Sequence, residues 1–272
     1  MQAPLSQAFD LCLAYPQWQG SGRHQHLPRG AAATAAVCSR FAPRMLEVSL
    51  SEAQGDGHGV RCWNAIFAQF RTAQALLARS GADRVLTAGG DCAVDVAVID
   101  YLNRRHRAMR VVWIDAHLDG NTPQTSPSGS FHGMPVAAIL GRAPPPMQRC
   151  LGVPLEPERF RYFGIQVGDD GDWALQRELD LQLLDPQQAF AGPVHIHFDL
   201  DVLDPQAFPH LAYTDGSLAV DAAVALLRRI AEGAEVVGLT LTEFSPVDAS
   251  AAAHGSRIVA QLCEAVAAVA RR

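Results

Sequence analysis

The sequence predicts an α/β protein, a single doubly wound domain around a mostly parallel sheet. Short apolar runs alternate along the chain with longer stretches rich in alanine, leucine and arginine, and the short runs lack strict apolar–polar alternation. Such runs are typical of strands buried on both faces, and their alternation with helices is typical of a parallel sheet. No repeat or low-complexity linker divides the chain, so we expect one domain over residues 1–272.

The expected elements follow from these runs in chain order. Strands are expected at Phe9–Ala14, Met45–Val48, Arg84–Thr87, Arg110–Asp115, Arg161–Gln166, Val194–Asp199 and Val236–Leu241. Helices are expected at Cys62–Arg79, Val94–Arg105, Trp173–Leu179, Ala219–Glu232 and Arg257–Ala270. Pro/Gly-rich loops at 17–30, 120–133 and 141–157 are long for simple connections, and long loops at sheet ends often carry function.

Composition excludes several classes of protein. The chain has 28 acidic against 22 basic residues and a net charge of −6, which argues against nucleic acid as a partner. Every basic residue is arginine. Because a pyridoxal-phosphate Schiff base, an aldolase-type imine and a Walker A loop each need a lysine, these enzyme classes are excluded.

The six cysteines lie far apart with no CxxC pair, so we expect buried free thiols rather than a disulfide framework. The N-terminus lacks the basic start and long apolar run of a signal peptide, and no window approaches 18 uninterrupted apolar residues. We therefore expect a cytoplasmic protein with no membrane partner.

Two acidic clusters follow predicted strands. Asp115, His117 and Asp119 recur at a spacing of two, as do His195, His197, Asp199 and Asp201. In extended backbone such residues point to one side. Ionised carboxylates at the end of a buried strand are costly unless a metal or an arginine neutralises them, so a metal site is favoured over surface acids. Carboxylates with an imidazole favour a hard or borderline ion such as Mn²⁺.

Taken together, these motifs resemble the arginase (ureohydrolase) family. The matching runs are GGDC at 89–92, DAHLD at 115–119, SGSFHG at 128–133, DLDVLDP at 199–205 and EFSP at 243–246, in the family's order. The resemblance implies an eight-stranded parallel sheet and a two-manganese site that hydrolyses a guanidinium group. Asn121-Thr122-Pro123, followed by Ser128 and His132, is closer to arginase than to agmatinase.

The resemblance also implies residue roles. Asp115 and Asp199 would bridge both Mn²⁺ ions; Cys92 and Asp119 would complete the ligands of one ion, and His117 and Asp201 those of the other. Glu243 would pair with the substrate guanidinium and His132 would shuttle protons, while Asp119 is counted with the catalytic residues as well. Asn121, Ser128, Ser130, Asp169 and Asp172 would bind the head group of a small guanidino amino acid. His195 and His197 are interpreted as core histidines, or as residues that support the ligands from behind, because the implied ligand set is already full.

The main departure from the family is GGDC where it reads GGDH. Cys92 is either an inert buried thiol or a thiolate ligand, and we favour the ligand because neighbouring metals deprotonate a thiol. Four ligand aspartates and a thiolate would then carry a total charge of −5, against +4 from two Mn²⁺. With an imidazole in place of the thiolate, the total ligand charge would be −4. A thiolate also admits a softer divalent ion at that site.

Substrate identity stays open at this point. Cysteine at this position resembles a branch of the family that hydrolyses Nω-hydroxy-L-arginine, as does the segment YTDG at 213–216. The presence of His132, in contrast, is consistent with L-arginine as the substrate. Gln166-Val167 stands where arginases carry a charged pair. The leading hypothesis is a hydrolase acting on arginine or its hydroxy derivative, which would yield ornithine and urea or hydroxyurea. The alternative is a catalytically inactive family member that binds metal or ligand. A homo-oligomer is also left open.

Overall fold

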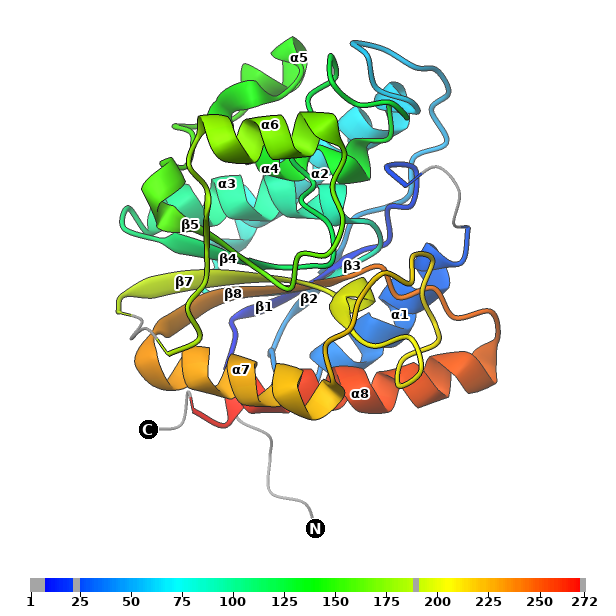
Figure 1. The fold of residues 1–272 in the computed structure, drawn as a ribbon. Coiled ribbons are helices and arrows are strands. Elements are labelled where there is room, and N and C mark those ends of the chain that lie inside the picture. Colours follow the sequence, from blue (N-terminus) through cyan, green and yellow to red (C-terminus); the bar gives the residue numbers. More distant parts are fainter. Residues whose placement is uncertain (1–7, 22–24, 188–190, 270–272) are drawn as a thin grey trace.

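The computed structural model describes residues 8–21, 25–187 and 191–269 (Figure 1). Within them, eight parallel strands form one sheet in the order β2-β1-β3-β8-β7-β4-β5-β6. The strands are β1 Leu11–Tyr15, β2 Met45–Glu47, β3 Val85–Gly89, β4 Arg110–Ile114, β5 Phe160–Phe163, β6 Gln182–Leu183, β7 Pro193–Asp199 and β8 Glu235–Thr242. The central strands are almost entirely buried because helices cover both faces of the sheet.

Helices lie on both faces of the sheet (Figure 1). The helices are α1 Leu27–Cys38, α2 Trp63–Ser80, α3 Asp95–Arg105, α4 Pro135–Ala137, α5 Pro145–Gln148, α6 Asp170–Glu178, α7 Val220–Gly233 and α8 Ala249–Ala267. Helices α1, α7 and α8 cover one face, and α2 to α6 cover the other. Each layer encloses its own apolar core, so the sheet separates two cores.

The expected doubly wound sheet is confirmed, and all of its pairings are parallel. The expected strands lie within a few residues of the observed ones. Helix α1, the short helices α4 and α5 and the two-residue β6 were not expected, and α8 begins at Ala249 rather than at Arg257. The expected helix end at Ala270 lies outside the described residues. No helix in the described part of the chain is long and apolar enough to cross a bilayer.

The described cysteines are all free, as expected. Four of them are buried, whereas Cys62 and Cys150 are only half-buried. Cys38 on α1 lies 4.0 Å from Cys263 on α8, measured between the sulfur atoms.

Strands β3, β8, β7 and β4 are neighbours at the centre of the sheet, and they run in the same direction. Their carboxyl ends therefore meet at one edge of the sheet. In open α/β sheets this is the edge where ligands bind. The acidic motifs of the sequence follow these strands.

Candidate metal centre

Each of the four central strands delivers one acidic or thiol side chain to this edge. Asp115 follows β4, Asp199 ends β7, and Glu243 follows β8. Cys92 begins a short 3₁₀ turn after β3, reached through Gly90, where a Cβ would lie 1.8 Å from the Gln17 carbonyl oxygen. Only glycine allows the backbone to pass there. Sequence segments about 150 residues apart, such as those of Cys92 and Thr242, are thus brought to one place.

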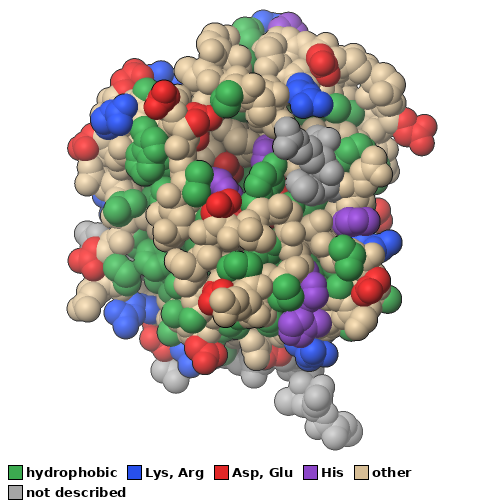
Figure 2. Space-filling model, turned by 45° about the vertical axis from the view of Figure 1, so that its right-hand side comes forward, with side chains coloured by type: hydrophobic (Ala, Val, Ile, Leu, Met, Phe, Trp, Pro, Cys, Tyr) green, Lys and Arg blue, Asp and Glu red, His purple; other side chains and the backbone are tan. Residues whose placement is uncertain are grey.

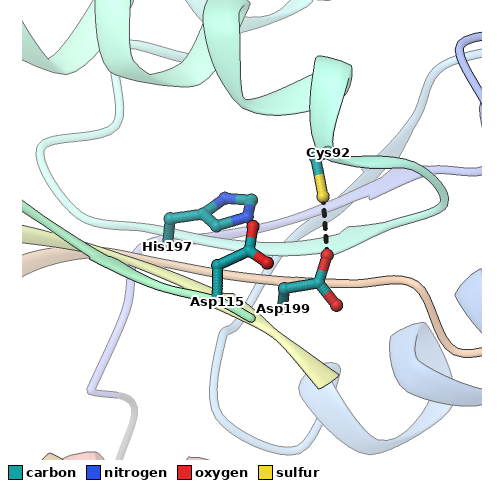
Figure 3. Close-up of side chains that lie close together, drawn as sticks. All are labelled: Cys92, Asp115, His197 and Asp199. Atoms are coloured by element: carbon teal, nitrogen blue, oxygen red, sulfur yellow. Dashed lines mark hydrogen bonds between the residues drawn. The ribbon is translucent and has the colours of Figure 1, made fainter. Parts of the chain in front are cut away.

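The first donor group consists of Cys92, Asp115, His197 and Asp199, all buried (Figure 3). One possible ligand atom from each lies within 4.8 Å of every other. Cys92 Sγ points down from its turn and donates a hydrogen bond of 2.7 Å to Asp199 Oδ2, while the other three side chains rise from β4 and β7. Asp115 is fixed by Trp113, whose Nε1 donates to Oδ2 at 2.9 Å.

The second donor group consists of Asp115, His117 and Asp201. His117 Nδ1 lies 3.1 Å from Asp201 Oδ2 and 3.5 Å from Asp115 Oδ1, so Asp115 belongs to both groups. On the other side of the ring, His117 Nε2 contacts Asp215 Oδ2 at 3.3 Å. The backbone N–H of Asp201 donates to Asp199 Oδ1 at 2.7 Å, which ties the two groups together.

Asp119 does not follow the expectation that residues at a spacing of two after β4 continue in extended backbone and point to one side. Strand β4 ends at Ile114, and Asp119 has a left-handed backbone with φ of +49°. Its side chain is buried beside the groups but joins neither of them, and its Oδ2 has no hydrogen-bond partner. Because the backbone leaves the extended conformation, periodicity cannot place this side chain. Its predicted role as a ligand stays a prediction.

Several buried carboxylate oxygens at this edge lack a hydrogen-bond partner among the described residues. They are Asp119 Oδ2, Asp201 Oδ1, Glu243 Oε1 and Glu243 Oε2. A buried oxygen without a partner is costly, and a buried carboxylate is costlier still unless a cation compensates it. The donor set of carboxylates, imidazoles and one thiol is one that divalent metals accept. The residues present therefore fit divalent cations.

The acids here are pushed toward their protonated forms. Burial, with the charge of Asp115 adding to it, raises the pKa of Glu243 to about 8 and that of Asp201 to about 6. Burial likewise raises the pKa values of Asp199 and Asp119, and lifts the pKa of the Cys92 thiol well above its ordinary value. Bound cations would reverse this balance by favouring the ionised forms.

A cavity of about 260 Å³ opens above the donor groups. In Figure 2 it is a hollow with acidic and histidine side chains at its floor. Its lining comprises Cys92, His117, Asp119, Asn121, Ser126, Pro127, Ser128, Ser130, His132, Gly133, Asp169, Asp172, Asp199, Asp201 and Tyr213. All the residues expected to bind the substrate head group thus line this cavity, and they are called its wall residues below. Glu243 lies beneath, with Oε1 3.7 Å from His132 Nδ1.

The wall residues also hold one another. Asn121 Nδ2 donates to Asp169 Oδ2 at 2.9 Å, and Asp169 caps α6 by accepting from the backbone N–H groups of Gly171 and Asp172. Asp172 accepts from the Gly120 backbone N–H at 2.8 Å. Asp169 and Asp172 are therefore structural acids as well as candidate substrate contacts. Ser128 is exposed at the mouth of the cavity.

Three site residues escaped the sequence reasoning. His197 belongs to the first donor group, although it was interpreted as a core or supporting histidine. Asp95 on α3 contacts both His195 and His197, and Asp215 contacts His117. The spacing of two between His195, His197 and Asp199 along β7 places these side chains on one face of the strand, so the sequence did indicate that His197 lies near Asp199. For Asp95 the sequence carried none, because its partners lie about 100 residues away.

Comparisons with a family model and with individual relatives agree on one family. Residues 63–268 match the model of the arginase family. Arginase of Coccidioides posadasii is 30% identical over 190 residues, 60% of this chain and 59% of its own. Arginase of Bacillus caldovelox is 27% identical over 190 residues, 60% of this chain and 61% of its own. The matched stretch thus spans about three fifths of the length of these relatives.

Solved structures share the fold over nearly the whole chain. Entamoeba histolytica arginase in complex with L-ornithine has a TM-score of 0.80 at 18% identity, covering 98% of this chain and 99% of its own. The native Bacillus caldovelox arginase has a TM-score of 0.80 at 21% identity, covering 97% and 98%. With the match to the family model over most of its length, this chain belongs to the arginase family.

Proposed function

We propose that this protein is a binuclear metallohydrolase that cleaves the guanidino C–N bond of L-arginine or a close derivative. The observation that carries the proposal is the convergence of Cys92, Asp115, His117, Asp199 and Asp201 from separate strand ends, with all of them except the fully buried Asp115 lining one cavity. In this proposal Asp115 and Asp199 would be shared between two Mn²⁺ ions. Cys92 and Asp119 serve one ion and His117 and Asp201 serve the other.

Guanidinium carbon is a poor electrophile, so the reaction requires a strong nucleophile at neutral pH. Two divalent cations, when bound, supply it by lowering the pKa of water by many units. The protein's own part is to bring the substrate carbon to that point in the right orientation.

Glu243 suits the recognition of a guanidinium. Its carboxylate is buried, both of its oxygens lack hydrogen-bond partners in the part of the chain that the structure describes, and burial raises its pKa to about 8. A planar guanidinium offers paired N–H donors that match a carboxylate, and its charge would favour the ionised acid. Glu243 would thus bind and aim the reacting group.

His132 suits the proton transfer. It lies beside Glu243 at the cavity, and burial lowers the pKa of its imidazole. A histidine that is neutral near pH 7 can pass a proton to a departing amine. Tyr213, whose ring centre is 5.4 Å from that of His132, borders the same space.

The wall around Asn121, Ser128, Ser130, Asp169 and Asp172 suits an amino-acid head group. These polar residues line the same cavity as the donor groups, and L-ornithine, bound by the Entamoeba histolytica arginase, is a molecule of this class. Agmatine lacks the carboxylate, so groups that would bind it stay unpaired.

Cys92 favours a second candidate within the same class, hydrolysis of Nω-hydroxy-L-arginine. Its thiol donates a hydrogen bond of 2.7 Å to Asp199 Oδ2, which places the sulfur next to another member of the first donor group. A thiolate adds a negative charge where an imidazole would add none, which disfavours ionisation of water. The hydroxyguanidine is less basic and has a better leaving group, so it needs less activation.

The test is a metal titration followed by product assays. The Mn²⁺-loaded protein is given L-arginine, Nω-hydroxy-L-arginine and agmatine, and release of ornithine or putrescine is measured. We expect turnover of at least one amino acid with kcat/KM on the order of a hundredfold or more above that for agmatine. Glu243→Gln should abolish most turnover, whereas Asp170→Asn, a change at an exposed acid on α6, should not.

Variants at Cys92 decide between the two amino acids. Cys92→Ser should weaken one of two metal sites and reduce turnover, while Cys92→His should restore binding and shift preference toward arginine. Comparable rates on agmatine would refute the assignment of the cavity wall. Two bound cations with no turnover of any of the three compounds would favour the non-catalytic family member.

A further inference from the structure

A buried polar network lies directly behind the first donor group. Asp95, the first residue of α3, has no exposed surface, nor do His195 and His197 on β7. Asp95 Oδ2 lies 2.8 Å from His195 Nε2 and 2.8 Å from His197 Nδ1, and Thr240 donates to Asp95 Oδ1 at 2.7 Å. One carboxylate therefore holds two histidines.

The network fixes the tautomer of His197. Asp95 Oδ1 accepts from Thr240 and Asp95 Oδ2 faces one ring nitrogen of each histidine, so both oxygens of this buried carboxylate serve as acceptors. A carboxylate accepts hydrogen bonds, hence the nitrogen of His197 that faces it, Nδ1, carries the proton. A neutral His197 then presents the lone pair of Nε2 on the opposite side of the ring.

Nε2 of His197 faces the donor group. With Nδ1 engaged by Asp95, it is the remaining nitrogen with which the ring can join Cys92, Asp115 and Asp199 (Figure 3). Among the described residues, this nitrogen has a hydrogen-bonding neighbour in Thr242 Oγ1, at 3.5 Å, the limit of a hydrogen bond. The ring is also held in its plane by Trp113, stacked at 3.5 Å between centroids and 5° between planes.

We propose that His197 is a metal ligand through Nε2, on the Cys92 side of the centre, and that Asp95 is the positioning residue that sets its tautomer. The inference rests on the proposed function, since it concerns a cation at the same site. A histidine that ligates a metal with one nitrogen almost always donates its other N–H to a carboxylate or carbonyl, as His197 does to Asp95. His197 thereby supplies from β7 an imidazole that the cysteine at position 92 does not supply.

Calorimetric titration of the metal-stripped protein with Mn²⁺ tests the proposal. His197→Asn retains an amide near the position of Nδ1, which can still contact Asp95, and removes Nε2. We expect the affinity of one of the two sites to fall tenfold or more, with the other site little changed. Unchanged affinity at both sites would overturn the proposal.

His195→Gln is the matched control. His195 lies on the same strand, is equally buried and makes the same contact to Asp95 through Nε2, which glutamine can replace, but it belongs to neither donor group. This variant should bind Mn²⁺ as the wild type does. If His195→Gln weakened one site as much as His197→Asn, the effect would be structural and the ligand assignment wrong.

Two further measurements separate ligation from folding and from the proposed function. Pulsed EPR of the Mn²⁺-loaded protein labelled with ¹⁵N-histidine should detect one fewer coordinating imidazole in His197→Asn; an equal number would refute ligation. Asp95→Asn, a change at a residue that contacts His197 but belongs to neither donor group, should weaken the same site by about 10- to 100-fold, and no effect would refute the positioning role. A wild-type protein that bound no Mn²⁺ would refute the proposed function itself, whereas two sites insensitive to His197→Asn would refute only this inference.

Discussion

At the residue scale, Asp119 and Glu243 share an unusual backbone. Both are left-handed, with φ of +49° and +60°. This conformation costs roughly 1 kcal/mol or more for a residue with a side chain, and such strain gathers at functional sites. In each case it turns a carboxylate off the line of its strand and into the buried space beside the donor groups.

The sequence predicted those site residues that follow directly from strand ends. Asp115, His117, Asp199 and Asp201 were predictable because the strands carrying them are apolar and parallel, which brings their ends together. The role of Asp95 was not predictable because nothing in its own segment indicates which strand α3 covers. His197 was visible in the alternation of β7, but its tautomer depends on Asp95.

Asp199→Asn should weaken both metal sites at once. Asp199 lies in the first donor group and its Oδ1 accepts from the Asp201 backbone in the second, so a neutral amide removes charge from both. Mn²⁺ content after dialysis measures this. Asp204→Asn is the control, because Asp204 lies in the same motif but only accepts from the Gln206 backbone N–H. Two retained equivalents of Mn²⁺ in Asp199→Asn would contradict the bridging role.

At the element scale, helix α1 begins inside a segment, residues 17–30, that was predicted to be a loop. It begins at Leu27 with Pro28 in its first turn, a position where proline is well tolerated. Its alanine-rich body carries a weak apolar pattern, and the flanking glycines and prolines of residues 17–30 suggested a loop. Burial against α8 and the sheet stabilises it instead.

Helix α8 begins eight residues before its expected start for a similar reason. Gly255 lies inside the helix, where glycine is unfavourable. A Cβ there would lie 2.3 Å from the Phe244 ring, so the missing side chain lets α8 pack against the residue that follows Glu243. Asp248 caps the helix by accepting from the Ala251 backbone N–H. Tertiary packing thus overrides local propensity.

Asp169→Ala should destabilise the metal-free protein. Asp169 accepts from two backbone N–H groups at the start of α6 as half of a capping box with Asp172. Losing such a cap costs about 1 kcal/mol. Urea unfolding measures the free energy. Asp170→Ala removes a neighbouring exposed acid that is not the cap, and it should have little effect. Equal stability of the two variants would argue against capping.

At the scale of the whole molecule, the parallel sheet explains why the site is so acidic. Parallel strands place all of their carboxyl ends at one edge, so every motif that follows a central strand meets the others there. The sequence predicted this edge because it depends only on strand direction and burial. The depth of the cavity depends on how the long loops pack, and periodicity carries no information about that.

This concentration of buried acids predicts how stability depends on pH without metal. Burial raises the pKa of Glu243 to about 8 and that of Asp91 to about 7, in each case above the value expected when unfolded. The folded state therefore holds protons that the unfolded chain has already released, and stability falls as pH rises through about 4 to 8. His117, whose pKa is raised by Asp115 and Asp201 against the effect of burial, adds to the fall. Burial lowers the pKa of His132, so this group makes stability rise with pH, but only below about pH 6.5.

Between pH 6.5 and 8.5 these acids and His117 all act in one direction, so the melting temperature in EDTA should fall. Each 1 kcal/mol corresponds to about 2–4 °C for a protein of this size, so a loss of a few kcal/mol amounts to roughly 5–10 °C. Mn²⁺ should restore more stability at pH 8.5 than at pH 6.5, because a cation replaces protons that the acids have lost. Glu243→Gln, which removes the acid with the highest of these pKa values, should flatten the curve in EDTA. A melting temperature in EDTA that stayed level or rose over this range would show that these carboxylates are not buried together as described.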